Sequence, residues 1–249
     1  MSDMLDKVNH RPWPLPKGPG VVSQECHDLL FAHWSVSIDS LRQTVPFSLP
    51  IDTFDGRPWI GITFFRTARA RLRGLPPIPW LSAFLALNVR TYVTMDGKPG
   101  VYFLSLDTSN RLVAAVARWT FPLPYFHARM SLTQVGDSLH CSSSRRRDSD
   151  APAEFVGSYR AVGPIVYPAR ESLDYWLTER YCLYAVDPNH RICRTEIHHL
   201  PWPLQQAEAE VHSNTMLLSH GLDPVDRAPL LHVARGLEIL VWPPKRINS

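Results

Sequence analysis

Arg90 is the residue whose chemical type and setting most directly suggest ligand binding. It lies mid-strand in a β-like stretch, where a simple core strand would be apolar. A guanidinium can bind a carboxylate through two parallel hydrogen bonds, so Arg90 could clamp an organic acid. Asn88 and Tyr92 share its strand face and would surround it with hydrogen-bonding groups. The alternative is that Arg90 forms an internal ion pair with Asp107 or Glu179.

The adjacent histidines His198 and His199, and the neighbours Glu179 and Arg180, are candidates for proton transfer. Imidazole titrates near physiological pH, so one of the histidines could act as a general acid or base. Adjacent residues on a strand point to opposite faces, so only one member of each pair can face an interior. The same divergence disfavours a metal ion shared by the histidines, and we expect neither a metal nor a cofactor. The candidate catalytic residues are Arg90, Glu179, His198 and His199.

Aromatic and hydroxyl side chains complete the expected ligand contacts. Three tyrosines, Tyr92, Tyr102 and Tyr125, could line a pocket and donate hydrogen bonds. The alternative, that they are structural residues of the core with a polar tip, is at least as common for tyrosine. Ser105 lacks the G-x-S-x-G sequence of a nucleophile elbow, so no hydrolase triad is indicated. The expected ligand-binding residues are Asn88, Arg90, Tyr92, Tyr102, Ser105, Tyr125 and Trp202.

Residues 88–107 predict the β-hairpin that would position Arg90. Turn formers at 95–100 separate two runs rich in valine, tyrosine and threonine. A four-residue loop would place Arg90 opposite Ser105 and Asn88 opposite Asp107. A two-residue loop would shift the partner of each of these residues by one pair and keep the partners on the same face of the hairpin.

The rest of the chain predicts many short strands with interspersed short helices and no regular strand–helix alternation. This pattern favours an antiparallel, mainly β fold. Prolines at 12, 14, 16 and 19 predict an extended arm over residues 1–20, before a single domain over residues 21–249. Strands are expected at 26–38, 59–73, 130–135, 138–144, 155–161, 181–186, 191–198, 230–233 and 237–241. Helices are expected at 39–42, 81–87, 109–119, 172–178 and 214–220; residues 204–212 are ambiguous, and 145–152 form a charged loop.

Composition limits the partners. The 249 residues are 45% hydrophobic and 20% charged, as in ordinary soluble globular chains, and a net charge of +3 is too small to indicate a polyanionic partner. The four cysteines form no C-x-x-C pair and are typical of free thiols in a reducing cytosol. The polar start predicts no signal peptide, and the most apolar run, 75–87, is too short to span a bilayer. We expect a cytoplasmic protein with a small-molecule ligand or substrate and no nucleic-acid or membrane partner; the sequence leaves room for a homo-oligomer.

Several ordered motifs resemble one family over roughly residues 12–244. They are LNVRTYV (87–93), PGVYFLSLD (99–107), LPYFHARM (123–130), LTERYCLY (177–184), IHHLPWPLQ (197–205) and PLLH (229–232). Together they resemble the YqjF-like family, the domain of unknown function 2071, which is distantly similar to acetoacetate decarboxylase. The resemblance implies a cone-like β-barrel or strongly curved sheet that encloses a pocket, with short flanking helices.

The resemblance does not extend to the chemistry of the decarboxylase. That enzyme uses a lysine after a Phe-Pro dipeptide to form a Schiff base. Here the nearest equivalent is Phe121-Pro122, and Tyr125 and Phe126 stand in place of amines. No lysine occurs between Lys98 and Lys245, so imine chemistry is not expected. Proteins of this family also often carry an acidic residue before LNVRTYV, where this chain has Ala86, which weakens any role for such a carboxylate as the general acid or base.

Two classes of function stay open. One is an enzyme that acts on an organic acid or carbonyl compound by acid–base chemistry without a Schiff base. The other is a non-catalytic protein that binds or senses a small molecule in the same pocket. An ionisable pair that faces the interior would favour the enzyme, and a wholly apolar lining would favour the binder.

Overall fold

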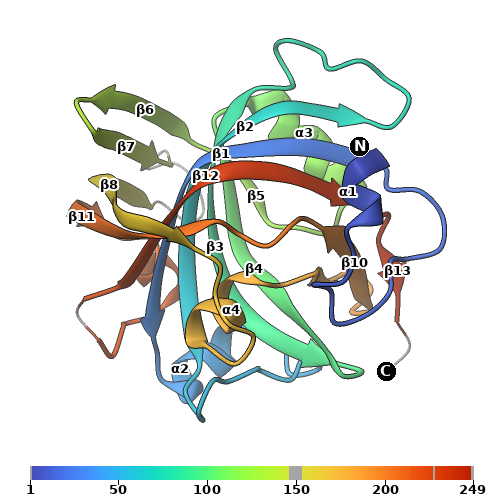
Figure 1. Ribbon diagram of the computed structural model, residues 1–249. Helices are drawn as coiled ribbons and strands as arrows, with labels where there is room; N and C mark the ends of the chain where they lie inside the picture. Colours follow the sequence, from blue (N-terminus) through green and yellow to red (C-terminus); the bar gives the residue numbers. More distant parts are fainter. Residues whose placement is uncertain (1, 146–152, 227, 248–249) are drawn as a thin grey trace.

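The computed structural model describes residues 2–145, 153–226 and 228–247 of the chain (Figure 1). The charged loop expected at 145–152 lies outside these residues, apart from Arg145. The described helices are α1 (Ser2–Asp6), α2 (Ile38–Thr44), α3 (Arg111–Thr120), α4 (Leu173–Thr178) and the short 3-10 helix η1 (Leu218–His220). The described strands are β1 (Val22–Ser35), β2 (Trp59–Leu72), β3 (Phe84–Met95), β4 (Lys98–Thr108), β5 (Tyr125–His127), β6 (Arg129–Val135), β7 (Ser138–Ser144), β8 (Glu154–Val166), β9 (Cys182–Val186), β10 (Ile192–His198), β11 (Leu204–Asn214), β12 (Leu230–Val241) and β13 (Lys245–Arg246).

The strands form one sheet that curves around an interior. Its order is β13-β10-β9-β4-β3-β2-β1-β12-β11-β8-β7-β6, with β5 attached to β4. β10 also pairs with β12, which brings together the two ends of the run of strands that extends from β10 to β12 in this sheet order. The strands β11, β8, β7 and β6 lie beyond this run (Figure 1). The fold is therefore mainly β, as predicted, and is a strongly curved sheet more than a clean barrel. One expectation was wrong: the sheet is mixed, because β4 pairs in parallel with both β5 and β9.

The alternation of side chains along the strands separates two hydrophobic clusters. On β3, Leu87 and Val89 point into the larger cluster, which also holds Phe64. Ala86 points the other way, into a smaller cluster with Phe65. Because successive strand residues face opposite sides, a residue's position along β3 decides which cluster it joins. The smaller cluster lies on the inner face that bounds the cavity described below.

The hairpin of β3 and β4 has a two-residue turn at Asp96-Gly97, both with positive φ, so the four-residue alternative was wrong. Near the turn the register is that of the two-residue loop, and Arg90 lies opposite Phe103. A β-bulge then adds Leu104 to β4, and Val89 pairs with Ser105. The bulge changes which residues of β4 share a face with Arg90, because one extra residue reverses the alternation.

Most local differences from the sequence expectations concern helices. No helix forms at 81–87, because these apolar residues join strand β3 from Phe84 onward. The helix expected at 39–42 is longer, and its N-cap is Ser37, whose side chain accepts the backbone N–H of Ser40 at 3.1 Å. The chain is strand up to Asn214 and forms only η1 before Gly221, so the helix expected at 214–220 is largely absent. Residues 230–241 make one strand, β12, in place of two.

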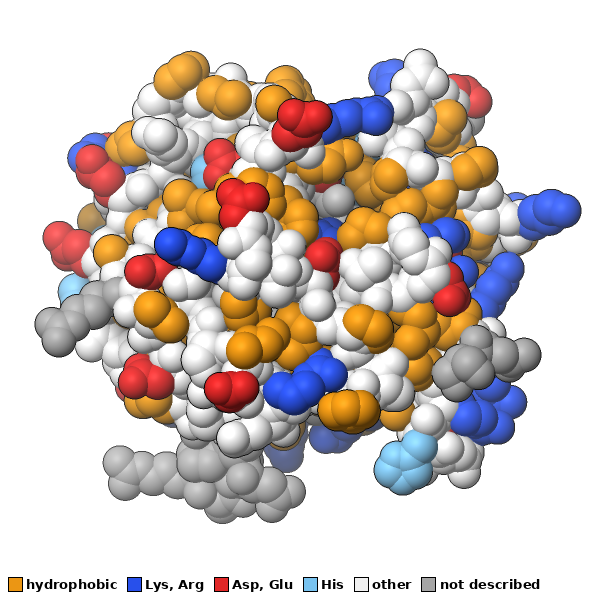
Figure 2. All heavy atoms as spheres, turned by 90° about the horizontal axis from the view of Figure 1, so that it is seen from below, with side chains coloured by type: hydrophobic (Ala, Val, Ile, Leu, Met, Phe, Trp, Pro, Cys, Tyr) orange, Lys and Arg blue, Asp and Glu red, His pale blue; other side chains and the backbone are white. Residues whose placement is uncertain are grey.

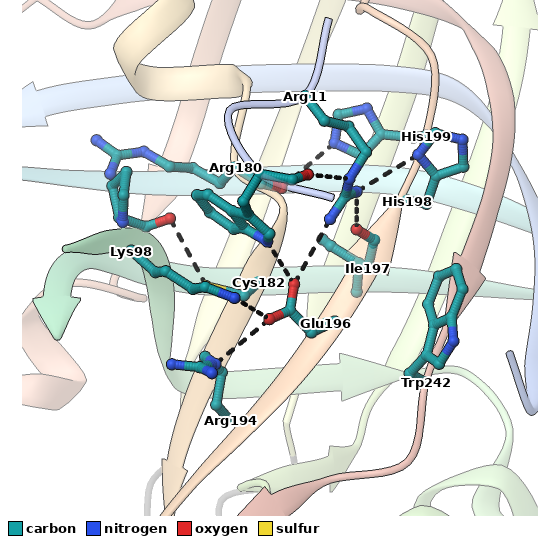
Figure 3. A network of polar contacts seen from close by, with 12 residues as sticks. Arg11, Lys98, Arg180, Cys182, Arg194, Glu196, Ile197, His198, His199 and Trp242 are labelled. Carbon is teal, nitrogen blue, oxygen red and sulfur yellow. Dashed lines mark hydrogen bonds and ion pairs between the residues drawn. The ribbon is translucent and has the colours of Figure 1, made fainter. Parts of the chain in front are cut away.

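The N-terminal arm begins with helix α1, which the prolines farther along the chain do not prevent. The arm is bound to the sheet through the carboxylate of Glu196 (Figure 3). Glu196 on β10 accepts the indole N–H of Trp13 at 2.7 Å and the Lys98 ammonium at 2.9 Å. Its carboxylate also lies 3.5 Å from Arg11 Nη2 and 3.4 Å from Arg194 Nε. We call these five residues the Glu196 cluster. They connect the arm to the β3–β4 turn and to β10.

The surface shows no single dominant charge on the face seen from below. Acidic and basic side chains are interspersed there, with hydrophobic side chains in patches between them (Figure 2). Among the described residues, this face shows no continuous basic surface (Figure 2). None of the described helices is both long and apolar enough to cross a membrane.

Candidate functional site

The curved sheet encloses a cavity of about 200 Å³ on the inner face of β1 to β4. Its walls are mainly apolar, and include Leu29, Phe31, Phe65, Phe84 and Trp202. A cavity with apolar walls and a few convergent polar groups is the usual form of a small-molecule site. The polar groups are therefore the features that decide its chemistry.

Arg90 is the central polar group of this wall. Its Nη2 donates to the carbonyl of Leu177 at 3.1 Å, and the guanidinium lies 5.4 Å from the centre of the Phe31 ring. No carboxylate among the described residues lies within ion-pair distance of Arg90, and its Nε is buried without a hydrogen-bond partner. Arg90 is half-buried with its Nε inside, so the missing carboxylate leaves an uncompensated positive charge at the cavity.

Neither expected protein partner binds Arg90. Asp107 forms an ion pair with Arg145 instead, with Arg145 Nη2 at 2.7 Å and both side chains fully buried. Burial raises the pKa of Asp107 to about 6, and Arg145 opposes that shift. Glu179 accepts the hydroxyl of Tyr181 and the backbone N–H of Trp202. The two internal ion pairs considered for Arg90 were therefore wrong.

Arg180 contributes a second guanidinium to the cavity wall. The strand expected at 181–186 begins only at Cys182, and Glu179 and Arg180 belong to the segment that follows α4. Arg180 Nη1 contacts Asp52 at 2.6 Å, and Nε donates to the carbonyl of Trp176 at 2.6 Å. Burial lowers the pKa of Arg180, and Asp52 opposes that shift. Unlike Arg90, Arg180 is neutralised by a carboxylate, although its Nη2 lacks a partner.

His33 lies in the same strand row as Arg90, and the sequence reasoning missed it. Across the sheet, His33 pairs with Gly61 and Gly61 pairs with Arg90. A Cβ at Gly61 would lie 2.6 Å from the His33 ring, so only glycine leaves room for it. His33 is fully buried with neither ring nitrogen bonded, and burial, with the nearby Arg90 charge, holds its pKa well below the ordinary value. The available signal was an isolated histidine within the apolar run LLFAHWSV.

The adjacent histidines diverge as predicted, and only His199 reaches the cavity wall. His198 instead contacts the carbonyl of Met4 at 2.9 Å and so belongs to the attachment of the N-terminal arm. His199 Nδ1 lies 2.8 Å from the carbonyl of Leu200, while Nε2 lies 3.3 Å from that of Arg180. Burial lowers the pKa of His199 to about 4, so the ring is neutral near pH 7 with a single N–H. The shorter contact assigns that proton to Nδ1, so Nε2 is the unprotonated nitrogen and faces the carbonyl oxygen of Arg180.

The remaining expected ligand contacts fall into two groups. Asn88, Tyr125 and Trp202 line the cavity. Tyr92 is fully buried and donates to Leu177 O at 2.9 Å, outside the cavity wall. Tyr102 lines a different, more open depression. Ser105 contacts His220 at 3.2 Å on the opposite face, because the bulge at Leu104 turns it away from Arg90.

The cavity lacks an amine nucleophile. No lysine of the described residues lines it. Lys98, in the β3–β4 turn, is bound to Glu196. Tyr125, which stands near the position implied for the decarboxylase amine, lines the cavity, and burial raises the pKa of its hydroxyl to about 12. Among the described residues, no group of three or more His, Cys, Asp or Glu side chains could hold a metal ion.

Comparison with solved structures supports the fold. The enduracididine biosynthesis enzyme MppR in complex with pyruvate matches with a TM-score of 0.64 at 12% identity, covering 96% of this chain and 93% of that one. The acetoacetate decarboxylase of Legionella pneumophila matches with a TM-score of 0.63 at 13% identity, covering 98% of this chain and 95% of that one. At such low identity, these likenesses establish the acetoacetate decarboxylase-like fold alone.

Comparison of sequences establishes the family. The uncharacterised protein YqjF of Bacillus subtilis (strain 168) is 42% identical over 240 residues, which are 96% of this chain and 98% of that protein. The profile of the family DUF2071, described as an uncharacterised conserved protein, matches residues 23–238. The chain therefore belongs to the DUF2071 family of YqjF-like proteins, which have an acetoacetate decarboxylase-like fold.

Proposed function

We propose that the cavity binds a small organic acid or carbonyl compound and acts on it by acid–base chemistry without a Schiff base. The observation that carries this proposal is the unpaired Arg90 in the cavity wall, whose buried Nε has no partner. A carboxylate would supply the missing negative charge and accept the fork of N–H groups. The free, buried thiols of the described cysteines fit a reducing compartment, and we place this activity in the cytoplasm.

The ionisable groups of the wall favour the enzyme over a passive binder. With an acid held at Arg90, the basic Nε2 of His199 can accept a proton from a carbon next to a carbonyl group. Tyr125 keeps its hydroxyl proton near pH 7 and can donate a hydrogen bond to the enolate oxygen that forms. His199 then returns the proton. Arg90 and Tyr125 bind and orient, and His199 moves the proton.

A binding experiment tests the anchor. Calorimetric titration with small carboxylic acids should detect binding to the wild type, and Arg90→Lys should weaken it by roughly 1–3 kcal/mol because the ammonium loses the planar two-donor fork. Arg66→Lys is the matched control, because Arg66 forms an exposed ion pair with Asp28. Equal affinities of Arg90→Lys and the wild type would contradict the anchor.

A second experiment separates the enzyme from the binder. In deuterium oxide, NMR should show loss of the protons next to the carbonyl of a bound 2-oxo acid, and His199→Gln should abolish this exchange while binding persists. Binding without exchange in the wild type would identify a non-catalytic binding or sensing protein. Borohydride reduction with acetoacetate or pyruvate should leave the intact mass unchanged, because no cavity amine exists to form an imine.

A further inference from the structure

Among the side chains that line the cavity, the charges nearly cancel, and one positive charge remains. Arg180 is neutralised by Asp52, and Asp107 by Arg145. His199 carries no charge near pH 7, because burial lowers its pKa to about 4. Arg90 alone has no carboxylate among the described residues. The site is therefore balanced by one negative charge, and a dianion would leave one charge unpaired in a low-dielectric interior.

The space beyond Arg90 is bounded by hydrocarbon. On the inner face, the strand row next to Arg90 holds Phe31, and the smaller hydrophobic cluster with Phe65, Ala86 and Trp202 continues along the cavity. The hydroxyls of Thr63 and Thr67 interrupt this wall and have no hydrogen-bond partner. They can accommodate a neutral oxygen but supply no charge. Binding energy in this region must come from apolar contact.

Cavity volume limits the size of that apolar body. The cavity measures about 200 Å³. An apolar cavity of about 150 Å³ holds a benzene molecule. The remaining volume fits a carboxylate and a short linker. Acetate or pyruvate would leave much of the apolar wall uncovered.

On the proposed function of the same site, we infer that the ligand is a monocarboxylic acid of about six to eight carbons in all, with a compact straight-chain or aryl-substituted hydrocarbon body. A substrate of the proposed reaction carries its carbonyl group within that body. The acid group pairs with Arg90, and the hydrocarbon covers Phe65, Phe84 and Trp202. Short keto acids and dicarboxylic acids are excluded as preferred ligands, the former by size and the latter by charge.

Calorimetric titration of the full chain with acetate, pyruvate, hexanoate, phenylacetate and adipate tests this selectivity. Each added methylene should tighten binding about threefold to fourfold, so hexanoate and phenylacetate should bind at least tenfold more tightly than acetate or pyruvate. Adipate should bind at least tenfold more weakly than hexanoate. Pyruvate or adipate binding as tightly as hexanoate would overturn the inference and leave the proposed function standing. If none of these acids binds, the proposed function itself fails.

Variants of the apolar wall localise the effect. Ala86→Leu adds bulk to the cavity and should weaken hexanoate binding at least tenfold while changing acetate binding less than twofold. Ala115→Leu adds the same atoms on the exposed face of α3 and is the control. Phe84→Ala enlarges the cavity at a half-buried position and should shift the preference toward octanoate, which keeps the test decisive if Ala86→Leu fails to fold. Unchanged chain-length preference in a folded variant of either kind would place the hydrocarbon elsewhere.

Discussion

Two regions of this protein are rich in arginine and histidine, and they differ in how well their polar atoms are paired. In the Glu196 cluster, both carboxylate oxygens accept bonds or ion pairs from surrounding side chains (Figure 3). Arg194 Nη1 is buried there without a hydrogen bond, but it lies 3.7 Å from the carboxylate of Asp96. At the cavity, Arg90 Nε and Arg180 Nη2 are buried without hydrogen-bond partners, as are both ring nitrogens of His33 in the strand row of Arg90. Both regions are interior, so burial alone does not distinguish them.

The difference separates a structural network from a binding site. Polar groups that satisfy one another stabilise the fold and leave little for a ligand to contribute. Buried donors without partners lower stability, and they persist where a ligand supplies the missing acceptor. The Glu196 cluster therefore holds the N-terminal arm, and the Arg90 region is the candidate site. The following variants should affect stability in the first region and binding in the second.

Acid should produce the largest change, because each region holds neutral buried histidines. Burial lowers the pKa of His198 and of His199 to about 4, and holds that of His33 well below its ordinary value. The unfolded chain binds these protons near pH 6.5 and the folded chain does not, so the free energy of unfolding should fall as the pH drops from 6.5 to 4. Each histidine contributes roughly 1.4 kcal/mol per pH unit.

Asp107 acts with the opposite sign but does not cancel this trend. Its pKa is raised to about 6, so the folded state keeps a proton that the unfolded chain has lost, and stability from this group increases as the pH falls from 6 toward 4. Burial also raises the pKa of Glu179, which acts in the same direction as Asp107, and lowers the pKa of His220 to about 4, which adds to the trend of the histidines. Two carboxyls therefore oppose four histidines, which leaves a net loss of roughly 3 kcal/mol per pH unit. Denaturant titrations at several pH values measure the slope, and His198→Asn should make it shallower. A flat profile from pH 6.5 to 4 would mean that these rings are protonated in the folded state.

Glu196→Gln should have the next largest effect. It removes the negative charge shared by Arg11, Lys98 and Arg194, and breaking such a buried pair costs about 3–5 kcal/mol. Thermal melts and proteolysis of the arm measure the loss. Glu208→Gln is the control, because Glu208 pairs with Arg160 on the exposed face of β11. Acid binding at Arg90 should be retained in folded Glu196→Gln protein, and its loss would show that the two regions are not separate.

Sequence patterns predicted the strands better than the site. Turn chemistry at Asp96-Gly97 and alternation along β3 put Arg90 on one strand face with Asn88, and the structure has both residues in the cavity wall. The bulge at Leu104 has no sequence signature in a run of strand-forming residues, so the orientation of Ser105 could not be predicted. The helix expected at 81–87 was wrong because residues 84–87 are all apolar, and a short apolar run does not distinguish helix from strand.

The partners of charged side chains depended on contacts that are distant in the sequence. Asp107 is paired with Arg145, which lies 38 positions away, and Arg180 with Asp52, which lies 128 positions away. His33 enters the Arg90 region only because Gly61, on the strand between them, leaves room for its ring. Such pairings follow from strand order, which local patterns do not encode.

Gly61→Ala should cause a moderate loss of stability centred on His33. The added Cβ would lie 2.6 Å from His33 Cδ2, and such overpacking costs about 1–3 kcal/mol. The same substitution in a His33→Ala background should cost much less, because the ring that it meets is gone. Denaturant unfolding of the four proteins of this cycle measures the coupling. Equal costs in both backgrounds would show that the His33 ring is not packed against Gly61.

The smallest effect on stability should come from Arg90→Lys. Arg180→Lys is the comparison, because Arg180 lies in the same cavity wall but is paired with a carboxylate. Arg180 loses a contact of 2.6 Å to Asp52 and its packing on Trp176, so Arg180→Lys should lower stability by about 1.5–3 kcal/mol. Arg90 has a bond of 3.1 Å to the carbonyl of Leu177 and a contact at 5.4 Å with the Phe31 ring. A lysine ammonium can keep both, so the loss should stay below about 1 kcal/mol. Thermal melts with and without hexanoate complete the comparison: the acid should raise the melting temperature of the wild type and Arg66→Lys, and raise that of Arg90→Lys much less. A large loss of stability in ligand-free Arg90→Lys would instead assign Arg90 to the structural network of the fold.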